Sequence, residues 1–414
     1  MNSRVHFILR IEGMTCDGCA RHVAQALKGV LGVESAEVGD WREGKAAVVA
    51  EESTPDETLA DAVSGAGYRA LIEAKRPLEE GKEVPLIKGT DFDLMAIGGG
   101  SAAFAAAIKA AELGARVAIV EAATIGGTCV NIGCVPSKTL IKAAEICYHS
   151  AYSNFKGMAA CPPPSEWQAV IRQKDELVGA LREEKYTKVL KAYPGITLIR
   201  GRAKLTGGRG VLVDGKPYNP GKILIATGSL PWAPSIPGLA EAGYMDSTDA
   251  LSLPELPKSL IVVGGGAIGL ELGQLFARFG VLVTLLVADP HIAPVEDPEI
   301  GNALKTYLEG ERITVVTGAK IERIDRSNSQ YKVQVEVNER RVTFQAEKLL
   351  VATGRRANTG GFGLEGAGVK LGKMGEIMVD SRLRTDNPDI YAAGDCIGNP
   401  MYVYVAAYGG QLAA

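Results

Sequence analysis

Residues 126–138 read GGTCVNIGCVPSK, and the predicted fold and active site are built around this stretch. Cys129 and Cys134 lie in its glycine-rich turn, and residues 139–148 follow with apolar side chains at helical spacing. A thiol at a helix N-terminus lies at the positive end of the helix dipole, which lowers its pKa and favours the thiolate. The stretch therefore predicts redox or soft-metal chemistry, with two buried structural cysteines as the alternative.

The stretch resembles the redox-active site of the FAD-dependent pyridine nucleotide-disulfide oxidoreductases, which include glutathione reductase and dihydrolipoamide dehydrogenase. Their pattern of Gly-Gly-Thr-Cys, four residues and Cys-Val-Pro-Ser-Lys is unbroken here. The resemblance implies a redox-active disulfide in which Cys129 is the outer thiol that meets the substrate and Cys134 is the inner thiol beside the flavin. It also implies that Gly127 and Thr128 contact FAD and that Lys138 lies by the reactive flavin nitrogen.

Upstream, residues 91–97 form a buried-strand pattern that leads into a Gly-x-Gly-x-x-Ala turn and then a helical run. Gly98, Gly100 and Ala103 of this turn allow close approach of a pyrophosphate to the helix N-terminus. Glu121 ends the next strand, where an acid binds a ribose hydroxyl. The glycine pattern alone is a weak signal, but with its strands and Glu121 it predicts a dinucleotide site. By the resemblance, this site holds FAD.

A second unit of the same kind spans residues 259–287, and the glycines of its Gly-x-Gly-x-x-Gly turn are Gly264, Gly266 and Gly269. By the resemblance this is the NAD(P)H site, and Glu271 pairs with Lys138 between nicotinamide and flavin. A solvated helix carboxylate is the alternative for Glu271.

The choice between NADPH and NADH stays open in the sequence. An acid after the second strand favours NADH, whereas arginines there favour NADPH. Asp289 is the only acid, one or two positions late, and no arginine occurs between Arg278 and Arg312. NADPH is the expectation that the family resemblance carries, with NADH possible.

Two further segments match the family's flavin-domain pattern. Residues 222–229 and 348–355 are buried-strand patterns that end in Ala-Thr-Gly turns, where the chain leaves and re-enters the flavin domain. The cofactor-contacting residues of these turns are expected to be Thr227, Gly228 and Gly354. Residues 385–395 resemble the second flavin motif, in which Asp395 binds the ribityl chain.

These patterns together predict an α/β fold with two dinucleotide-binding domains. The FAD-binding domain is expected at residues 90–230 and 356–414, and the NAD(P)-binding domain at 231–355. Residues 1–73 are expected to form a small ferredoxin-like βαββαβ domain. Residues 74–89 lack apolar periodicity and are expected to be a linker that keeps the small domain at high local concentration near the core.

The small domain carries a Cys-x-x-Cys pair, Cys16 and Cys19, where a loop meets a helix. A bare pair of this spacing fits redox, zinc and soft-metal roles. No second pair or His-x-x-x-His in this domain completes a zinc tetrahedron, whereas two thiolates suit two-coordinate Cu(I) or Hg(II). The Gly-Met-Thr-Cys-x-x-Cys wording resembles heavy-metal-associated domains, which implies soft-metal capture.

The composition is that of a soluble globular protein. The net charge is 45 − 48 = −3, which gives no electrostatic case for binding nucleic acid. No apolar run reaches the roughly 20 residues of a membrane span. Seven cysteines, an odd number, do not suggest a secreted disulfide framework, and the N-terminus lacks a signal-peptide core. We therefore expect a cytoplasmic protein.

Fusion of a metal-capture domain to this core resembles the mercury(II)-reducing branch of the family. The resemblance implies that Hg(II), arriving as thiol complexes, binds Cys129 and Cys134 and is reduced to Hg(0) by NAD(P)H through FAD, in detoxification. Two alternatives stay open. One is a disulfide reductase of the dihydrolipoamide dehydrogenase or glutathione reductase type with an appended metal-binding domain. The other is a metal-binding or redox-sensing protein without turnover.

Relatives of this kind continue past the second flavin motif into a dimerisation domain that makes a homodimer. Here the sequence ends at Ala414, no histidine follows His291 and no cysteine follows Cys396. We therefore expect a chain without that domain, which does not form the proper homodimer and has weak or no turnover.

Overall fold

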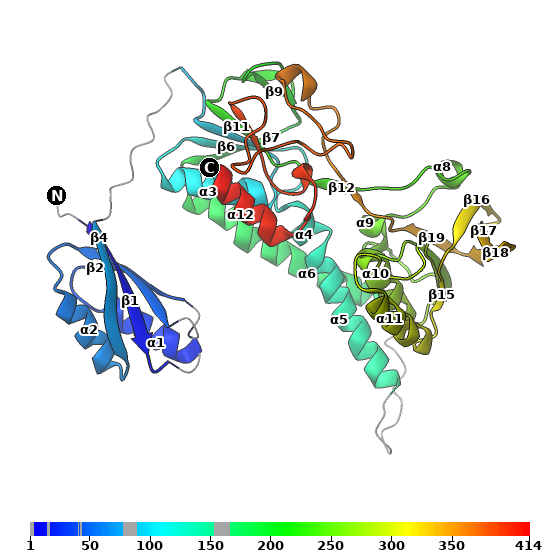
Figure 1. Ribbon diagram of the computed structural model, residues 1–414, viewed down its shortest axis with the longest axis horizontal. Helices are drawn as coiled ribbons and strands as arrows, with labels where there is room; N and C mark the ends of the chain where they lie inside the picture. The colour runs from blue at the N-terminus through cyan, green and yellow to red at the C-terminus, as the bar shows by residue number, and fades with distance from the viewer. Residues whose placement is uncertain (1–3, 15–16, 40, 42–43, 78–88, 153–165) are drawn as a thin grey trace. The chain divides into compact units, whose positions relative to one another are not determined.

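The computed structural model describes residues 4–14, 17–39, 41, 44–77, 89–152 and 166–414 (Figure 1). The chain divides into two compact units, Met1–Leu86 and Ile87–Ala414, and each is treated by itself. Across the described ranges, no helix combines the length and the apolar character needed to cross a lipid bilayer.

The first unit has the predicted βαββαβ order. Its elements are β1 (Arg4–Glu12), α1 (Asp17–Lys28), β2 (Val33–Val38), β3 (Lys45–Glu51), α2 (Asp56–Gly65) and β4 (Arg69–Pro77). The antiparallel sheet has the order β2-β3-β1-β4. Alternate residues of β1, including Phe7 and Leu9, are buried against Val23 and Leu27 of α1. The expected end of this domain at residue 73 is wrong, because β4 stays paired with β1 as far as Pro77; residues 78–88 of the expected linker lie outside the described residues.

The second unit begins with a parallel sheet of order β21-β11-β5-β6-β7. It belongs to the half expected to bind FAD, which is called the flavin half below. Its strands are β5 (Leu94–Ile97), β6 (Val117–Glu121), β7 (Ile196–Arg200), β11 (Lys222–Ile225) and β21 (Ile390–Ala392). Helix α3 (Ser101–Glu112) covers one face, and α12 (Val403–Ala413) lies alongside α3 (Figure 1). The two helices approach so closely that a Cβ at Gly410 would collide with the carbonyl oxygen of Ala102.

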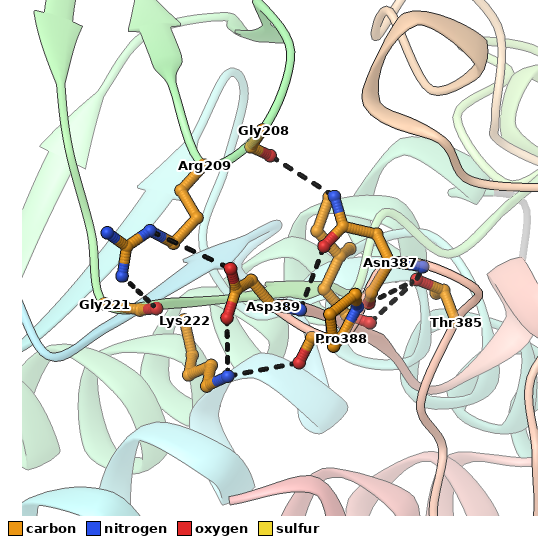
Figure 2. Close-up of polar contacts among 9 residues, drawn as sticks. Gly208, Arg209, Gly221, Lys222, Thr385, Asn387, Pro388 and Asp389 are labelled. Atoms are coloured by element: carbon orange, nitrogen blue, oxygen red, sulfur yellow. Dashed lines mark hydrogen bonds and ion pairs between the residues drawn. The ribbon is translucent and has the colours of Figure 1, made fainter.

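A small antiparallel sheet of β8 (Ala203–Leu205), β9 (Val211–Val213) and β10 (Lys216–Tyr218) packs on the other face of the parallel sheet. Figure 2 shows the polar cluster that ties it to the segment before β21. Lys222 donates to a carboxylate oxygen of Asp389 at 2.6 Å, and the Asn387 amide donates to the carbonyls of Ala367 and Gly208 at 2.8 and 3.4 Å.

The half expected to bind the pyridine nucleotide, called the pyridine-nucleotide half below, is built on a second parallel sheet of order β15-β14-β13-β19. Its strands are β13 (Ser259–Val263), β14 (Leu282–Leu286), β15 (Thr314–Val316) and β19 (Lys348–Val351). Helices α10 (Ala267–Arg278) and α11 (Pro298–Gly310) belong to this half. An antiparallel meander of β16 (Lys320–Ser327), β17 (Gln330–Val337) and β18 (Arg340–Ala346), which the sequence analysis did not identify, packs on one sheet face.

Two short strands carry the chain between the halves. β12 (Ser229–Pro231) leaves the flavin half and pairs antiparallel with β20 (Arg355–Ala357), which returns to it. Two short helices, α8 (Leu239–Ala242) and α9 (Ser247–Ala250), follow β12.

Long helices from the flavin half also reach the pyridine-nucleotide half. The short helix α4 (Gly127–Asn131) precedes α5 (Cys134–Ala151), whose Leu140 and Ala144 pack in one core with Leu272 and Phe276 of α10. A second long helical segment consists of α6 (Trp167–Arg182), a π-helical turn (Glu183–Thr187) and α7 (Lys188–Ala192). Its Trp167 indole donates to the Leu253 carbonyl at 2.8 Å, which fixes it to the loop after α9.

Candidate active site

The two cysteines of the 126–138 stretch lie on different helices. Cys129 is inside the five-residue helix α4, and Cys134 is the first residue of α5, after Gly133. Cys129 is partly buried and Cys134 is exposed, and both are free thiols. The two thiols lie close enough for Cys134 to raise the pKa of Cys129, so the fold brings the predicted redox pair together.

The protonation of this pair differs from the prediction. Burial raises the pKa of the Cys129 thiol to about 12, and its hydrogen bond with Cys134 and the charge of that thiol raise it too. The predicted lowering of the pKa is wrong for Cys129, because the burial of this thiol and its interaction with Cys134 raise the pKa instead.

One turn into α5, Lys138 meets the residue predicted to pair with it. Its Nζ lies 2.5 Å from Oε1 of Glu271 on α10. Both side chains are well exposed, at 59% and 40%. The pair therefore stands at the junction of the two dinucleotide-binding halves, on the helix that begins with Cys134.

The first glycine turn leaves the N-terminus of α3 open. Gly100 caps the helix without a side-chain hydrogen bond, and a Cβ at Gly98 would collide with the Ala226 carbonyl oxygen. Gly127 packs directly against this turn, since a Cβ added at Gly127 would lie 2.7 Å from the Cα of Gly100. Glu121 faces this turn: a Cβ at Gly99 would lie 2.7 Å from its carboxylate oxygen. Bare backbone and one acid are the features that a dinucleotide requires here.

Two other residues predicted on this turn have packing positions. Ala103 is fully buried within α3, and Thr128 is partly buried next to Gly127. The Thr128 carbonyl accepts from the Ile132 backbone N–H at 3.0 Å, which closes the short helix α4.

The second glycine turn repeats the geometry of the first. Gly266 caps α10 without a side-chain hydrogen bond, and a Cβ at Gly264 would collide with the carbonyl oxygen of Ala352. Gly269 is buried, and a Cβ added at this residue would collide with the carbonyl oxygen of Gly264. The residue that faces this turn, as Glu121 faces the first, is the buried Val287, whose Cγ1 would lie 2.6 Å from a Cβ at Gly265.

The Ala-Thr-Gly turns meet the second flavin motif. The Thr227 hydroxyl donates to the Asn358 carbonyl at 2.6 Å, and the Gly228 carbonyl accepts from the Asn358 N–H at 2.9 Å. Gly354 is exposed and has a φ of 129°, a backbone conformation that favours glycine at this turn into β20.

Asp395 belongs to a polar network that the sequence analysis missed. It accepts a 2.7 Å hydrogen bond from the Ser229 hydroxyl, which in turn accepts from Arg355 Nε at 2.8 Å. Burial lowers the pKa of the Arg355 guanidinium, and the charges of Asp395 and Asp246 oppose that effect. The network joins β12, through Ser229, and β20, through Arg355, to the second flavin motif. No local sequence signal links residues so far apart.

The metal-capture pair can be described only in part. Cys16 lies outside the described residues, and Cys19 is partly buried on α1. Nearby on the same helix, the His22 ring packs edge-on against Tyr68, with ring centroids 6.0 Å apart. In the described part of the chain, no group of three or more His, Cys, Asp or Glu could hold a metal ion.

Comparisons with known proteins agree with this arrangement. Residues 92–410 match the pyridine nucleotide-disulphide oxidoreductase family, and residues 8–69 match the heavy-metal-associated domain. The solved structure of the HOCl-induced flavoprotein disulfide reductase RclA from Escherichia coli is similar with a TM-score of 0.69 and 33% identity, over 77% of this chain and 69% of that one. The chain belongs to the pyridine nucleotide-disulphide oxidoreductase family, and a heavy-metal-associated domain precedes its catalytic core.

Several of its relatives are mercuric reductases. The Staphylococcus aureus protein is 41% identical over 98% of this chain and 73% of its own length. The Lysinibacillus sphaericus protein is 42% identical over the same shares of the two chains.

Proposed function

We propose that this chain reduces Hg(II) to Hg(0) with electrons from NADPH, passed through FAD and the Cys129–Cys134 pair, in mercury detoxification. The observation that carries the proposal is the pair of neighbouring thiols beside the first dinucleotide turn, in a chain that also has a heavy-metal-associated domain. Thiolates are the preferred ligands of soft cations. The similarity to mercuric reductases supports the same substrate.

The residues of the first turn fit FAD. The open N-terminus of α3 offers backbone N–H groups to a pyrophosphate, Gly100 and Gly127 leave no side chain in the way, and Glu121 is placed for a ribose hydroxyl. Asp395, oriented by Ser229, is our candidate for the ribityl chain. When bound, FAD would supply the two-electron redox chemistry between the pyridine nucleotide and the cysteine pair.

The cysteine pair binds the substrate in this proposal. An incoming Hg(II)–thiol complex exchanges its two thiol ligands for Cys129 and Cys134, and the two protein thiols give up their protons. Hg(II) then takes two electrons and leaves as Hg(0). We assign Cys129 to the substrate side and Cys134 to the flavin side, as in the family pattern. Lys138, held by Glu271, places a positive charge between nicotinamide and flavin.

Val287 supports NADPH as the electron donor. An acid at the end of the second strand selects NADH by accepting a hydrogen bond from the ribose 2′-hydroxyl. Glu121 has that position in the first unit, whereas the second unit has the buried Val287, which cannot accept a hydrogen bond. Asp289 is exposed two residues further on, beyond the position that faces the glycine turn.

Cys16 and Cys19 collect Hg(II) in this account. The pair is two cysteines in a separate compact unit that is covalently joined to the catalytic core. A tethered collector raises the effective concentration of bound metal near the core without a permanent contact.

The assay that tests the proposal measures NADPH oxidation by the purified flavoprotein. Hg(II) in excess small thiol should accelerate the oxidation, and an organic disulfide such as oxidised glutathione or lipoamide should not. The second candidate function, disulfide reduction, is suggested by the similarity to the flavoprotein disulfide reductase RclA. It predicts the opposite substrate preference. A protein that consumes NADPH with neither substrate would contradict both.

A further inference from the structure

Asn131 stands between the two cysteines and contacts three backbone carbonyls. Its amide Nδ2 lies 2.9 Å from the Ile125 oxygen, 3.0 Å from the Gly127 oxygen and 3.3 Å from the Thr124 oxygen. These carbonyls belong to the turn that enters the short helix α4, of which Asn131 is the last residue. One side chain therefore fastens the end of α4 to its own beginning and to the turn before it.

Arg182, the last residue of α6, fixes the other side of this carboxamide. Its Nε donates to Asn131 Oδ1 at 2.8 Å. Carbonyls only accept and a guanidinium only donates, so the amide has a single orientation that satisfies both sets of partners. The contact joins the cysteine segment to a long helix that is otherwise anchored in the core by Trp167.

Helix α4 depends on such contacts because it is short. Five residues make little more than one turn, and an isolated helix of that length is unstable in water. Cys129 is in the middle of this turn, whereas Cys134 begins α5, an 18-residue helix packed in the core. The position of Cys129 relative to Cys134 thus depends on what holds α4 in place.

We propose that Asn131 and Arg182 are positioning residues for the dithiol, which hold α4 so that the sulfur of Cys129 stays in contact with that of Cys134. This inference rests on the proposed redox role of the cysteine pair. Holding two groups together raises the effective concentration of one at the other. The clamp formed by Asn131 and Arg182 should therefore favour every state that joins the two sulfurs, the disulfide above all.

The clamp should act on the thiol–disulfide equilibrium between the cysteine pair and glutathione. Cys129 and Cys134 lose two protons and two electrons and form one S–S bond, while one oxidised glutathione takes up both and becomes two glutathione thiols. Loosening α4 lowers the effective concentration and shifts this equilibrium toward the dithiol. A tenfold loss corresponds to a midpoint potential about 30 mV less negative for a two-electron couple.

The experiment equilibrates the flavin-loaded protein in glutathione buffers of graded ratio, then quenches with acid and alkylates. Trypsin releases residues 117–138, between Arg116 and Lys138, as one peptide that contains only these two cysteines, so mass spectrometry reads the pair alone. Asn131→Ala and Arg182→Met should each shift the midpoint by about 30 mV or more, a tenfold change. Arg182→Lys keeps a donor and should recover most of the wild-type value.

Figure 2 shows the matched controls. The Asn387 carboxamide also donates to two carbonyls and accepts at Oδ1 from the backbone N–H of Asp389 at 2.9 Å. The Nε of Arg209 lies 3.9 Å from the carboxylate of that same Asp389, and both Asn387 and Arg209 are remote in sequence from α4. Asn387→Ala and Arg209→Met should therefore leave the midpoint at the wild-type value.

Each outcome is informative. An unshifted midpoint in Arg182→Met, or an equal shift in the control variants, would overturn the positioning role while leaving the redox pair intact. If the wild-type protein forms no disulfide at any glutathione ratio, Cys129 and Cys134 are not a redox pair, and the proposed function is contradicted. Arg182→Met lies outside the cysteine segment, so the test stands even where Asn131→Ala does not fold.

Discussion

Nζ of Lys138 lies 2.5 Å from Oε1 of Glu271, and this ion pair links α5 of the flavin half to α10 of the pyridine-nucleotide half. Both side chains are substantially exposed, and exposed ion pairs contribute about 0–1 kcal/mol to folding. Stability therefore does not explain the contact, and its location between the two halves is why we propose a role for it in electron transfer.

Glu271→Gln should separate these two effects. The substitution removes the charge that holds Lys138, so flavin reduction by NADPH should slow about tenfold, which is about 1.4 kcal/mol in the barrier. The free energy of unfolding should change by less than about 1 kcal/mol. Stopped-flow absorbance and urea denaturation measure the two quantities. A destabilised protein with an unchanged reduction rate would show that the pair is structural.

The assignment of the inner thiol can be tested by absorbance. Cys134→Ser should abolish the long-wavelength thiolate-to-flavin band of the reduced enzyme, because the proposal places Cys134 beside the flavin. Cys129→Ser should retain or enhance the band. A band that survives in Cys134→Ser would reverse the two roles. The inner thiol would then be Cys129, which is partly buried, and the outer thiol would be Cys134, which is exposed.

Replacing both Cys16 and Cys19 with alanine should leave turnover of small Hg(II)–thiol complexes nearly intact. The two cysteines belong to a separate compact unit, so the catalytic core keeps its own thiols. Acquisition of Hg(II) from a protein donor should become slower. Steady-state rates with the two mercury sources make the comparison, and loss of all core activity in a folded, flavin-loaded variant would rule out a collector role.

Cys396 should make stability depend on alkaline pH. Burial raises the pKa of this thiol to about 12, whereas an unfolded cysteine titrates near 8.5. The folded state therefore keeps a proton that the unfolded state loses, so the contribution is fully present below about pH 8.5 and falls as pH rises. The stability difference between wild type and Cys396→Ala should decrease by up to about 1.4 kcal/mol per pH unit above pH 9. A difference independent of pH, measured by urea denaturation, would contradict this.

Much of this architecture could be predicted because the relevant signals are local. Gly98 and Gly264 belong to glycine patterns that predict dinucleotide turns. A Cβ added at either residue would collide with a neighbouring carbonyl oxygen. The βαββαβ order of the small domain likewise follows from successive strand and helix patterns. Lys138 and Glu271 were paired through a family resemblance, and the fold brings them into contact.

The contacts that could not be predicted join distant segments. Arg182 reaches Asn131 from 51 positions away, and Arg355 reaches Ser229 from 126 positions away. Neither pair has a spacing that sequence periodicity can reveal. The meander strand β17 did carry a local signal, the alternation of buried Tyr331, Val333 and Val335, which could have identified it.

The central claim is that the Cys129–Cys134 pair presents Hg(II) for two-electron reduction by NADPH. Its most direct test is the stoichiometry of a single turnover, with flavin-loaded enzyme whose cysteine pair has first been reduced to the dithiol, limiting NADPH and Hg(II) in excess small thiol, and Hg(0) collected from the gas phase. The account predicts one Hg(0) per NADPH oxidised and none from the Cys129→Ser/Cys134→Ser double variant. Oxidation of NADPH without Hg(0), or equal Hg(0) from the double variant, would contradict it.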